Sequence, residues 1–218
     1  AVDQAIEAAG LDVDIIGGAA HSIPVDWFSD LKAGGAFEHM DAIAIHPYST
    51  RPEQFEDQIA LLRLAMGDTQ LPIEVTEFGQ EFGSLAEAPN YLVKMVSVMA
   101  ASGIERASWY ALAKQQWFPN MELYDPTTGT STPAGKAFAF MDMLLGIGEV
   151  TKLAVDDFTY AYAFGVNAMV VWGEPRSISL GAGVNAYDLT GNLITEFSGK
   201  IDSITPIVLI SDAPITLG

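Results

Sequence analysis

The chain has 218 residues, half of them hydrophobic, with no cysteine and a formal net charge of −18 from 28 acidic and 10 basic residues. This composition excludes a disulfide framework, a thiolate nucleophile and cysteine-ligated zinc, and it offers no basic patch for the phosphates of a nucleic acid. No apolar run is long enough for a transmembrane helix, and the length suits one large domain or two small ones.

The first two-thirds of the chain alternates short apolar strands with amphipathic helices. A strand-and-helix repeat of about 30 residues predicts right-handed βαβ units and a parallel sheet. The expected strands are Val13–Ile16, Ala42–Ile45, Ile73–Val75 and Glu105–Ala111. The expected helices cover about 1–9, 25–31, 51–66, 89–101 and 133–145.

Local signals mark several of these boundaries. A turn at Gly17-Gly18 is expected to end the first strand, and Thr50 with Glu53 has the spacing of a capping box. Gly67 is a plausible helix stop. Thr132 is expected to cap a helix whose first position is Pro133.

The pattern changes after Gly146, where helix signals give way to short alternating strands separated by glycine-rich turns. The expected strands are Phe158–Phe164, Ala168–Trp172, Ser177–Leu180, Val184–Asp188 and Ile207–Ile210. We therefore predict an α/β domain over residues 1–146 and a separate antiparallel β-domain, a small sandwich, over residues 147–218.

Polar and aromatic side chains stand at the ends of all four expected strands. Because the carboxyl ends of parallel strands carry the catalytic groups of barrel enzymes, we expect them to converge on one pocket. Each alone has an ordinary structural explanation, such as a helix cap or a packed core side chain. A buried carboxylate is costly unless it is hydrogen-bonded or paired, so the glutamate among them is the most telling. The group comprises His21, His46, Tyr48, Glu77, Trp109 and Tyr110.

The order of four segments, GGA, IAIHPY, PIEVTEFG and ASWY, resembles the second half of a clan A glycoside hydrolase. Within that clan, the sequence pattern most resembles family 39 and the cellulase-like members of family 5. This resemblance implies the second half of a (β/α)8 TIM barrel, about four βα units, over residues 1–146. The later segments MVVWGEP and AYDLTGN are similar to the accessory β-sandwich of family 39-like enzymes.

The resemblance also implies a function and roles for individual residues. The implied activity is retaining hydrolysis of the O-glycosidic bonds of a poly- or oligosaccharide by double displacement, with two carboxylates about 5–5.5 Å apart. Glu77 matches the nucleophile, and no cofactor or metal ion is expected. Substrate binding is expected of the other group members and of one loop tryptophan, namely His46, Tyr48, Trp109, Tyr110, His21 and Trp117.

The match is incomplete in two respects. A full barrel takes about 250 residues and eight strands, whereas residues 1–146 supply four. The family's acid/base glutamate follows an asparagine, and no Asn-Glu pair occurs in this chain. Glu81, Glu74 and Glu174 are unsuitably placed to replace it. We therefore expect an N-terminal half-barrel chain or segment, or self-association, to complete the enzyme, since four strands alone would leave open, aggregation-prone edges.

Two other functions stay open at this point. The chain is alternatively a non-catalytic carbohydrate-binding or structural module derived from such an enzyme. A metal-dependent hydrolase has three histidines to draw on, but neither an HExxH motif nor paired-histidine spacing occurs. The resemblance, rather than any signal in these residues, implies an extracellular or periplasmic location.

Overall fold

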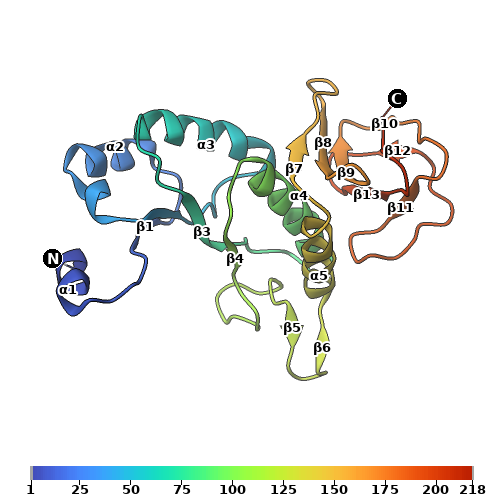
Figure 1. The fold of residues 1–218 in the computed structure, drawn as a ribbon. Coiled ribbons are helices and arrows are strands. Elements are labelled where there is room, and N and C mark those ends of the chain that lie inside the picture. Colours follow the sequence, from blue (N-terminus) through green and yellow to red (C-terminus); the bar gives the residue numbers. More distant parts are fainter. Residues whose placement is uncertain (1, 218) are drawn as a thin grey trace. The chain divides into compact units, whose positions relative to one another are not determined.

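The computed structural model describes residues 2–217 and combines a parallel sheet, an antiparallel sheet and helices in a mixed α/β fold (Figure 1). The chain divides into two compact units. The first runs to Phe78 and resumes over Ser102–Trp109, and the second comprises Gly79–Ala101 and the chain from Tyr110 onward. This division does not test the predicted domain boundary after residue 146, which stays a prediction.

The first unit is built on a four-stranded sheet in the order β1-β2-β3-β4, with every pair parallel. Helices α2 and α3 contact each other and lie on the same side of these strands (Figure 1). The strands are β1 (Ile16–Ala20), β2 (Ala42–Ile45), β3 (Ile73–Phe78) and β4 (Ala107–Trp109). The helices are α1 (Val2–Ala9), α2 (Val25–Ala33), the 3-10 helix η1 (Ala36–His39) and α3 (Pro52–Met66).

Helix α3 forms as its apolar spacing predicts. Phe55, Ile59, Leu62 and Met66 are all buried, so one stripe of the helix faces the core. The helix ends at Gly67, whose φ of +60° is readily adopted only by glycine. The predicted capping box is wrong: Arg51 is the N-cap, and the Thr50 hydroxyl instead donates to Gln58 Oε1 at 2.7 Å.

The first strand also differs from its prediction. The pair Gly17-Gly18 lies within β1 rather than in a turn after it, and Val13 is exposed. The glycines are needed where β1 approaches β2, because a Cβ on Gly18 would come within 2.9 Å of the Ala44 carbonyl oxygen. The periodicity of the sequence does not show this contact between β1 and β2, so the predicted strand was placed too early in the chain.

Strands β3 and β4 carry an irregularity at their carboxyl ends. Val75 pairs with Ala107 and Phe78 with Trp109, so three steps along β3 match two along β4. This extra residue is the signature of a β-bulge, which bends a strand and re-aims its side chains. Strand β3 is thus longer than predicted and includes Glu77, and β4 is shorter than predicted.

The second unit contains α4 (Ala88–Ala101) and α5 (Pro133–Leu145). Its main sheet has five antiparallel strands in the order β11-β13-β9-β8-β7, beside the two-stranded pairs β10-β12 and β5-β6. The strands are β5 (Tyr124–Asp125), β6 (Thr130–Ser131), β7 (Val150–Lys152), β8 (Thr159–Phe164), β9 (Ala168–Gly173), β10 (Arg176–Ser177), β11 (Asn185–Tyr187), β12 (Lys200–Ile201) and β13 (Ile207–Ile210).

Most of these elements agree with the sequence prediction. Among the described residues after α5, none is helical. The Thr132 hydroxyl accepts from the Gly135 amide at 3.1 Å, which confirms the predicted cap of α5. The strand predicted at Ser177–Leu180 is wrong in extent, since β10 ends at Ser177.

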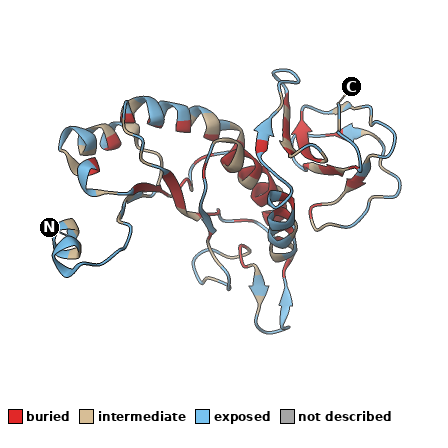
Figure 2. Cartoon of the chain, in the orientation of Figure 1, coloured by how far each residue is buried: buried red, intermediate tan, exposed pale blue. Residues whose placement is uncertain are grey.

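Both faces of the five-stranded sheet are covered, which is why every residue of β9 is buried (Figure 2). On one face, Ala161, Met169 and Leu209 form an apolar core with Ile201 from β12. The alternate residues face α4. Among them, Trp172 is fully buried and stacks on two tyrosines of β8, with ring centroids 5.3 Å from Tyr160 and 5.4 Å from Tyr162.

Helix α4 is attached to this sheet through a buried lysine. Lys94 Nζ lies 5.4 Å from the centroid of the Trp172 ring and donates to the Ser203 carbonyl oxygen at 2.6 Å. A buried ammonium group is tolerated only where it is paired or hydrogen-bonded. The helix, the sheet and the segment before β13 are therefore held at one polar point within an apolar core.

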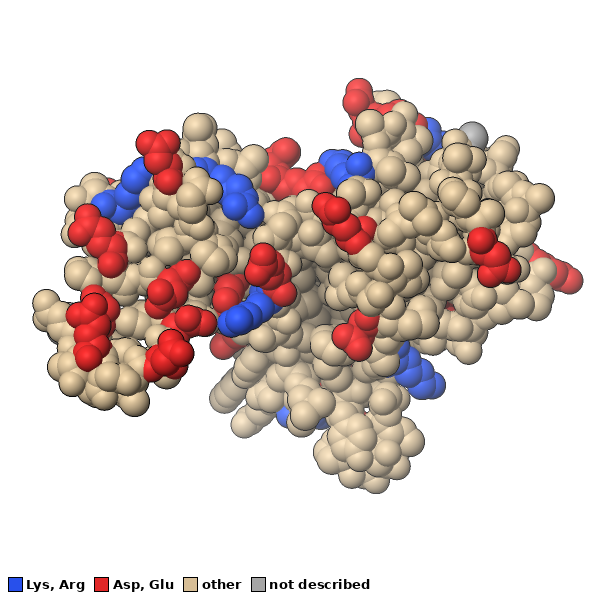
Figure 3. All heavy atoms as spheres, in the orientation of Figure 1, with Lys and Arg blue, Asp and Glu red and all other residues tan. Residues whose placement is uncertain are grey.

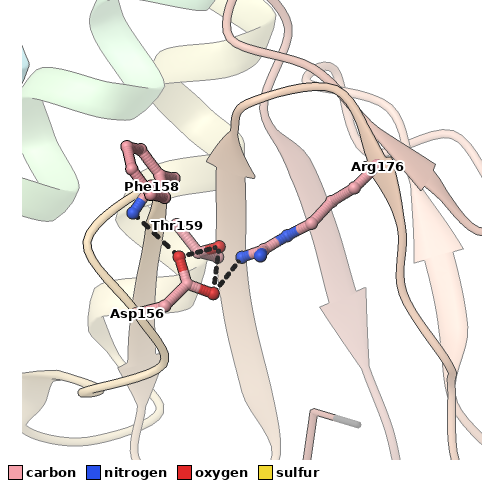
Figure 4. A network of polar contacts seen from close by, with 4 residues as sticks. All are labelled: Asp156, Phe158, Thr159 and Arg176. Carbon is pink, nitrogen blue, oxygen red and sulfur yellow. Dashed lines mark hydrogen bonds and ion pairs between the residues drawn. The ribbon is translucent and has the colours of Figure 1, made fainter.

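A carboxylate organises the turn that leads into β8 (Figure 4). Asp156 accepts from the Phe158 amide at 2.8 Å and from the Thr159 hydroxyl, and it forms an ion pair with Arg176. The Phe158 amide is the largest influence that holds the pKa of Asp156 below its ordinary value. Desolvation is the second largest and opposes it, while Arg176 and Thr159 add to the lowering.

This network predicts a pH-dependent stability. A carboxyl group whose pKa is lowered by folding stabilises the protein above its ordinary pKa, and it loses that contribution as the pH falls through the folded value. We expect Asp156→Ala to be less stable than the wild type at pH 7, and the gap to narrow as the pH falls below about 4. Urea unfolding at pH 7 and pH 3 measures it. The neighbouring Asp157→Ala is the control, and an equal gap at both pH values would contradict the assignment.

Candidate active site

The carboxyl end of the parallel sheet in the first unit gathers four of the side chains predicted to form a site. His21 follows β1, His46 and Tyr48 follow β2, and Glu77 is the last residue but one of β3. Parallel strands end at the same edge of a sheet, so residues far apart in sequence meet there. This meeting was predicted from the order of the strands, and the side chains contact one another as follows.

Glu77 is the centre of the group. The Tyr48 hydroxyl donates to Glu77 Oε2 at 2.7 Å, and His46 Nδ1 lies 3.7 Å from the same oxygen. Both contacts converge on Oε2, so the other carboxylate oxygen, Oε1, is free of them. The Glu77 side chain is 42% exposed, whereas that of His46 is 16% exposed. The carboxylate is therefore oriented from one side and accessible to an approaching molecule from another.

Aromatic packing fixes the ring that holds this carboxylate. The Tyr48 ring contacts two imidazoles, with centroids 5.2 Å from His21 and 6.1 Å from His46. The plane of the Tyr48 ring is tilted by 33° to the plane of the His21 ring, and it is nearly perpendicular, at 79°, to the plane of the His46 ring. Rings packed in this way have little freedom to rotate, so the Tyr48 hydroxyl is held toward Glu77.

Thr76 belongs to the site although the sequence analysis did not select it. Its Oγ1 lies 2.8 Å from His46 Nε2, so the imidazole is contacted on both of its nitrogens. Successive residues of a regular strand point to opposite faces, yet Thr76 and Glu77 both reach the His46–Tyr48 segment. The bulge in β3 accounts for this, and the sequence carries no evident signal for it.

The remaining predicted site residues have different surroundings. Trp109 is only 8% exposed and packs edge-on against Phe78, with ring centroids 5.2 Å apart. Tyr110 and Trp117 belong to the second unit. There the Tyr110 hydroxyl lies 3.4 Å from Gln115 Oε1, and Trp117 is 77% exposed. The roles assigned to these three aromatic residues stay predictions.

A second group of carboxylates lies around the start of β3, away from Glu77. Glu74 is buried and pairs with Arg106, whose Nη1 lies 3.4 Å from Glu74 Oε1. Together they line a cavity of about 210 Å³ with Asp14, Asp41 and Glu105. Asp41 is already engaged, because its carboxylate accepts from the Ile15 amide at 2.8 Å. Glu74 thus forms a structural ion pair with Arg106 and is not the second carboxylate that Glu77 would need.

Carboxylates predominate over basic groups on the face shown in Figure 3, in keeping with the net charge of −18. Within residues 2–217, no three His, Asp or Glu side chains are grouped closely enough to hold a metal ion. The helices of that same range are all too short or too polar to cross a membrane.

Several solved structures resemble this fold, and two of the three described here are glycoside hydrolases. A family 39 glycoside hydrolase β-xylosidase from Caulobacter crescentus is 16% identical, with a TM-score of 0.57 over 97% of this chain and 60% of its own. SrfJ from Salmonella typhimurium is 13% identical, with a TM-score of 0.58 over 96% and 50%. A family 44 xyloglucanase from Paenibacillus polymyxa is 11% identical, with a TM-score of 0.51 over 99% and 59%.

These similarities describe the fold, and the chain spans only about 50–60% of the length of the three structures. Comparison with curated proteins found no match. A family model described as "Glycosyl hydrolase catalytic core" matches residues 22–138, which is more than half of the chain and includes His46, Tyr48, Glu77 and Trp109. The resemblance to glycoside hydrolases is thereby confirmed, and the chain belongs to the glycosyl hydrolase catalytic core family.

Proposed function

We propose that this chain is the nucleophile-bearing part of a retaining glycoside hydrolase, with Glu77 as the nucleophile. The observation that carries the proposal is the hydrogen bond from Tyr48 to one oxygen of a carboxylate that is otherwise accessible. A nucleophilic carboxylate must be ionised, oriented and reachable. The Tyr48 hydroxyl and the nearby His46 imidazole both face Oε2 and orient the carboxylate, and Oε1 is the oxygen left for attack.

The proposed reaction has two steps. In the first, Glu77 Oε1 forms a bond to the anomeric carbon while the bond to the leaving oxygen breaks, and a second carboxylic acid protonates that oxygen. In the second step, that second acid, now a carboxylate, takes a proton from water. The water oxygen bonds to the anomeric carbon while the bond to Glu77 Oε1 breaks. Tyr48 continues to hold Oε2 throughout, because its donor faces the oxygen that does not react.

The second carboxylate is proposed to come from outside the four-stranded sheet. An N-terminal half-barrel, as a segment or as a separate chain, or a second copy would supply it. Three features support this: the strands run in sequential parallel order, β1 and β4 are the outer strands of their described sheet, and the chain spans about half of the compared structures. On this proposal the first unit belongs to the second half of a (β/α)8 barrel.

The substrate is proposed to be an oligo- or polysaccharide. The compared structures include a β-xylosidase and a xyloglucanase, and aromatic rings suit the apolar faces of sugars. We propose that His21, His46 and Tyr48 surround the reacting sugar, while Trp109, Tyr110 and Trp117 provide aromatic contacts. The small strands after α5 are proposed to form the accessory sandwich, supported by the shared core of β8, β9, β13 and β12. An extracellular or periplasmic location is part of the same proposal.

Trapping of the glycosyl-enzyme tests the proposal directly. The full-length protein is incubated with 2-deoxy-2-fluoro glycosides of xylose and of glucose that carry a good leaving group, and is then digested for mass spectrometry. We expect a covalent adduct on the peptide that contains Glu77, because a retaining enzyme passes through that ester. The anomer released from a normal aryl glycoside, followed by NMR, is expected to be the retained one. An adduct on another residue, or an inverted product, would reject the assignment.

A further inference from the structure

The bulge in β3 brings two neighbouring side chains, Thr76 and Glu77, to the imidazole of His46. Thr76 contacts His46 at Nε2, and Glu77 faces the other ring nitrogen, Nδ1, at 3.7 Å. A regular strand would send one of these side chains to the opposite face. The two contacts therefore form a chain from hydroxyl to imidazole to carboxylate within the first unit.

We propose that Thr76 is a positioning residue that donates its hydroxyl proton to His46 Nε2 and so places the imidazole proton on Nδ1, facing Glu77 Oε2. The proposal rests on the proposed role of Glu77 as the nucleophile. A neutral imidazole carries one proton, and the nitrogen that accepts a hydrogen bond is the one without it. When Nε2 accepts from Thr76, the single proton of the neutral ring is therefore on Nδ1.

The charge on Glu77 favours this direction of the hydrogen bond. With the opposite tautomer, Nδ1 would turn a lone pair toward a carboxylate oxygen 3.7 Å away, which is unfavourable. With Nδ1–H, the same separation gives attraction, although it exceeds the length of a good hydrogen bond. His46 is mostly buried, so water competes little for either nitrogen. Glu77 Oε2 then faces two proton-bearing groups, Tyr48 and His46.

A purely structural role for Thr76 is the competing explanation, because threonine also suits a strand. Two substitutions separate the roles. Thr76→Val keeps the branched shape and strand preference but removes the hydroxyl, whereas Thr76→Ser keeps the hydroxyl and loses a methyl group. A structural role predicts that Val is tolerated better than Ser. The positioning role predicts the reverse.

The experiment observes the imidazole directly. The full-length protein is labelled with 15N-histidine, and long-range 1H–15N spectra are recorded at a pH where His46 is neutral, as found from its own titration. The signals that disappear in His46→Gln identify this residue. We expect the Nδ1–H form in the wild type and in Thr76→Ser, and a mixture of both tautomers in Thr76→Val. An Nε2–H form in the wild type, or an unchanged Nδ1–H form in Thr76→Val, would overturn the proposal.

Kinetics provide a second readout. Loss of one such oriented hydrogen bond is expected to lower kcat of Thr76→Val roughly tenfold with little change in KM, and Thr76→Ser is expected to restore it. This result is separable from the proposed function. If Glu77→Gln is inactive but Thr76→Val keeps the wild-type kcat, the positioning role fails and the nucleophile stands. If Glu77→Gln is fully active, the nucleophile assignment fails, and the tautomer measurement still decides what Thr76 does to His46.

Discussion

Replacement of Glu77 by glutamine is expected to lower kcat by at least about a thousandfold, the largest effect of any single substitution in this chain. An amide has nearly the size of a carboxylate but carries no negative charge, so it cannot form the glycosyl ester. The Tyr48 hydroxyl can still donate to the amide oxygen, which should preserve the local geometry. Steady-state hydrolysis of an aryl glycoside by the full-length protein measures the effect, with unfolding curves to show that the variant is folded.

A nearby carboxylate offers the matched control. Glu81 is exposed and lies four residues further along the chain, so Glu81→Gln makes the same chemical change outside the proposed machinery and should leave kcat unchanged. Hydrolysis retained in Glu77→Gln would reject Glu77 as the nucleophile. A wild-type protein that binds glycans without hydrolysing them would instead favour the non-catalytic carbohydrate-binding function.

Removal of the Trp172 side chain is expected to produce the largest loss of stability, about 3–5 kcal/mol in the free energy of unfolding. Its ring is fully buried between Tyr160 and Tyr162, and Lys94 lies over it. Trp172→Ala would leave a large cavity and would also remove the ring beside a buried ammonium group. Urea unfolding followed by circular dichroism measures the change.

The adjacent strand supplies a control for this effect as well. Phe158 is 57% exposed at the start of β8, so Phe158→Ala removes an aromatic ring with little loss of buried area and is expected to cost less than about 1 kcal/mol. A similar loss in both variants would show that the stack of Trp172 with the tyrosines is not a principal support of the second unit. A loss confined to Trp172→Ala would support it.

The sequence predicted the centre of the site because that centre follows from topology. Once β2 and β3 are recognised as neighbouring parallel strands, His46, Tyr48 and Glu77 must meet at their carboxyl ends. The helices were also predictable where apolar spacing and end signals agree, as for α3 with Gly67 and for α5 with Thr132. In these cases the information is local or depends on strand order alone.

Other features depend on pairing between distant segments, which the sequence does not display. The position of β1 was misplaced because Gly17 and Gly18 look like a turn until β2 lies beside them. Thr76 lies beyond the predicted end of its strand at Val75, and only the pairing with β4 reveals the extra residue that brings it to the site. The burial of Trp109 against Phe78 is a tertiary contact of the same kind.

The bulge also determines how relatives of this chain should be aligned. Strand residues are usually equated in steps of two, so that core faces core and solvent faces solvent. Between Val75 and Phe78 that rule breaks, because Thr76 and Glu77 act from one side. An alignment that inserts or removes a position here would still match the apolar start of β3, but it would pair Glu77 with the wrong residue of the relative. In this strand the Thr76–Glu77 pair, rather than the hydrophobic alternation, therefore marks where the carboxylate stands.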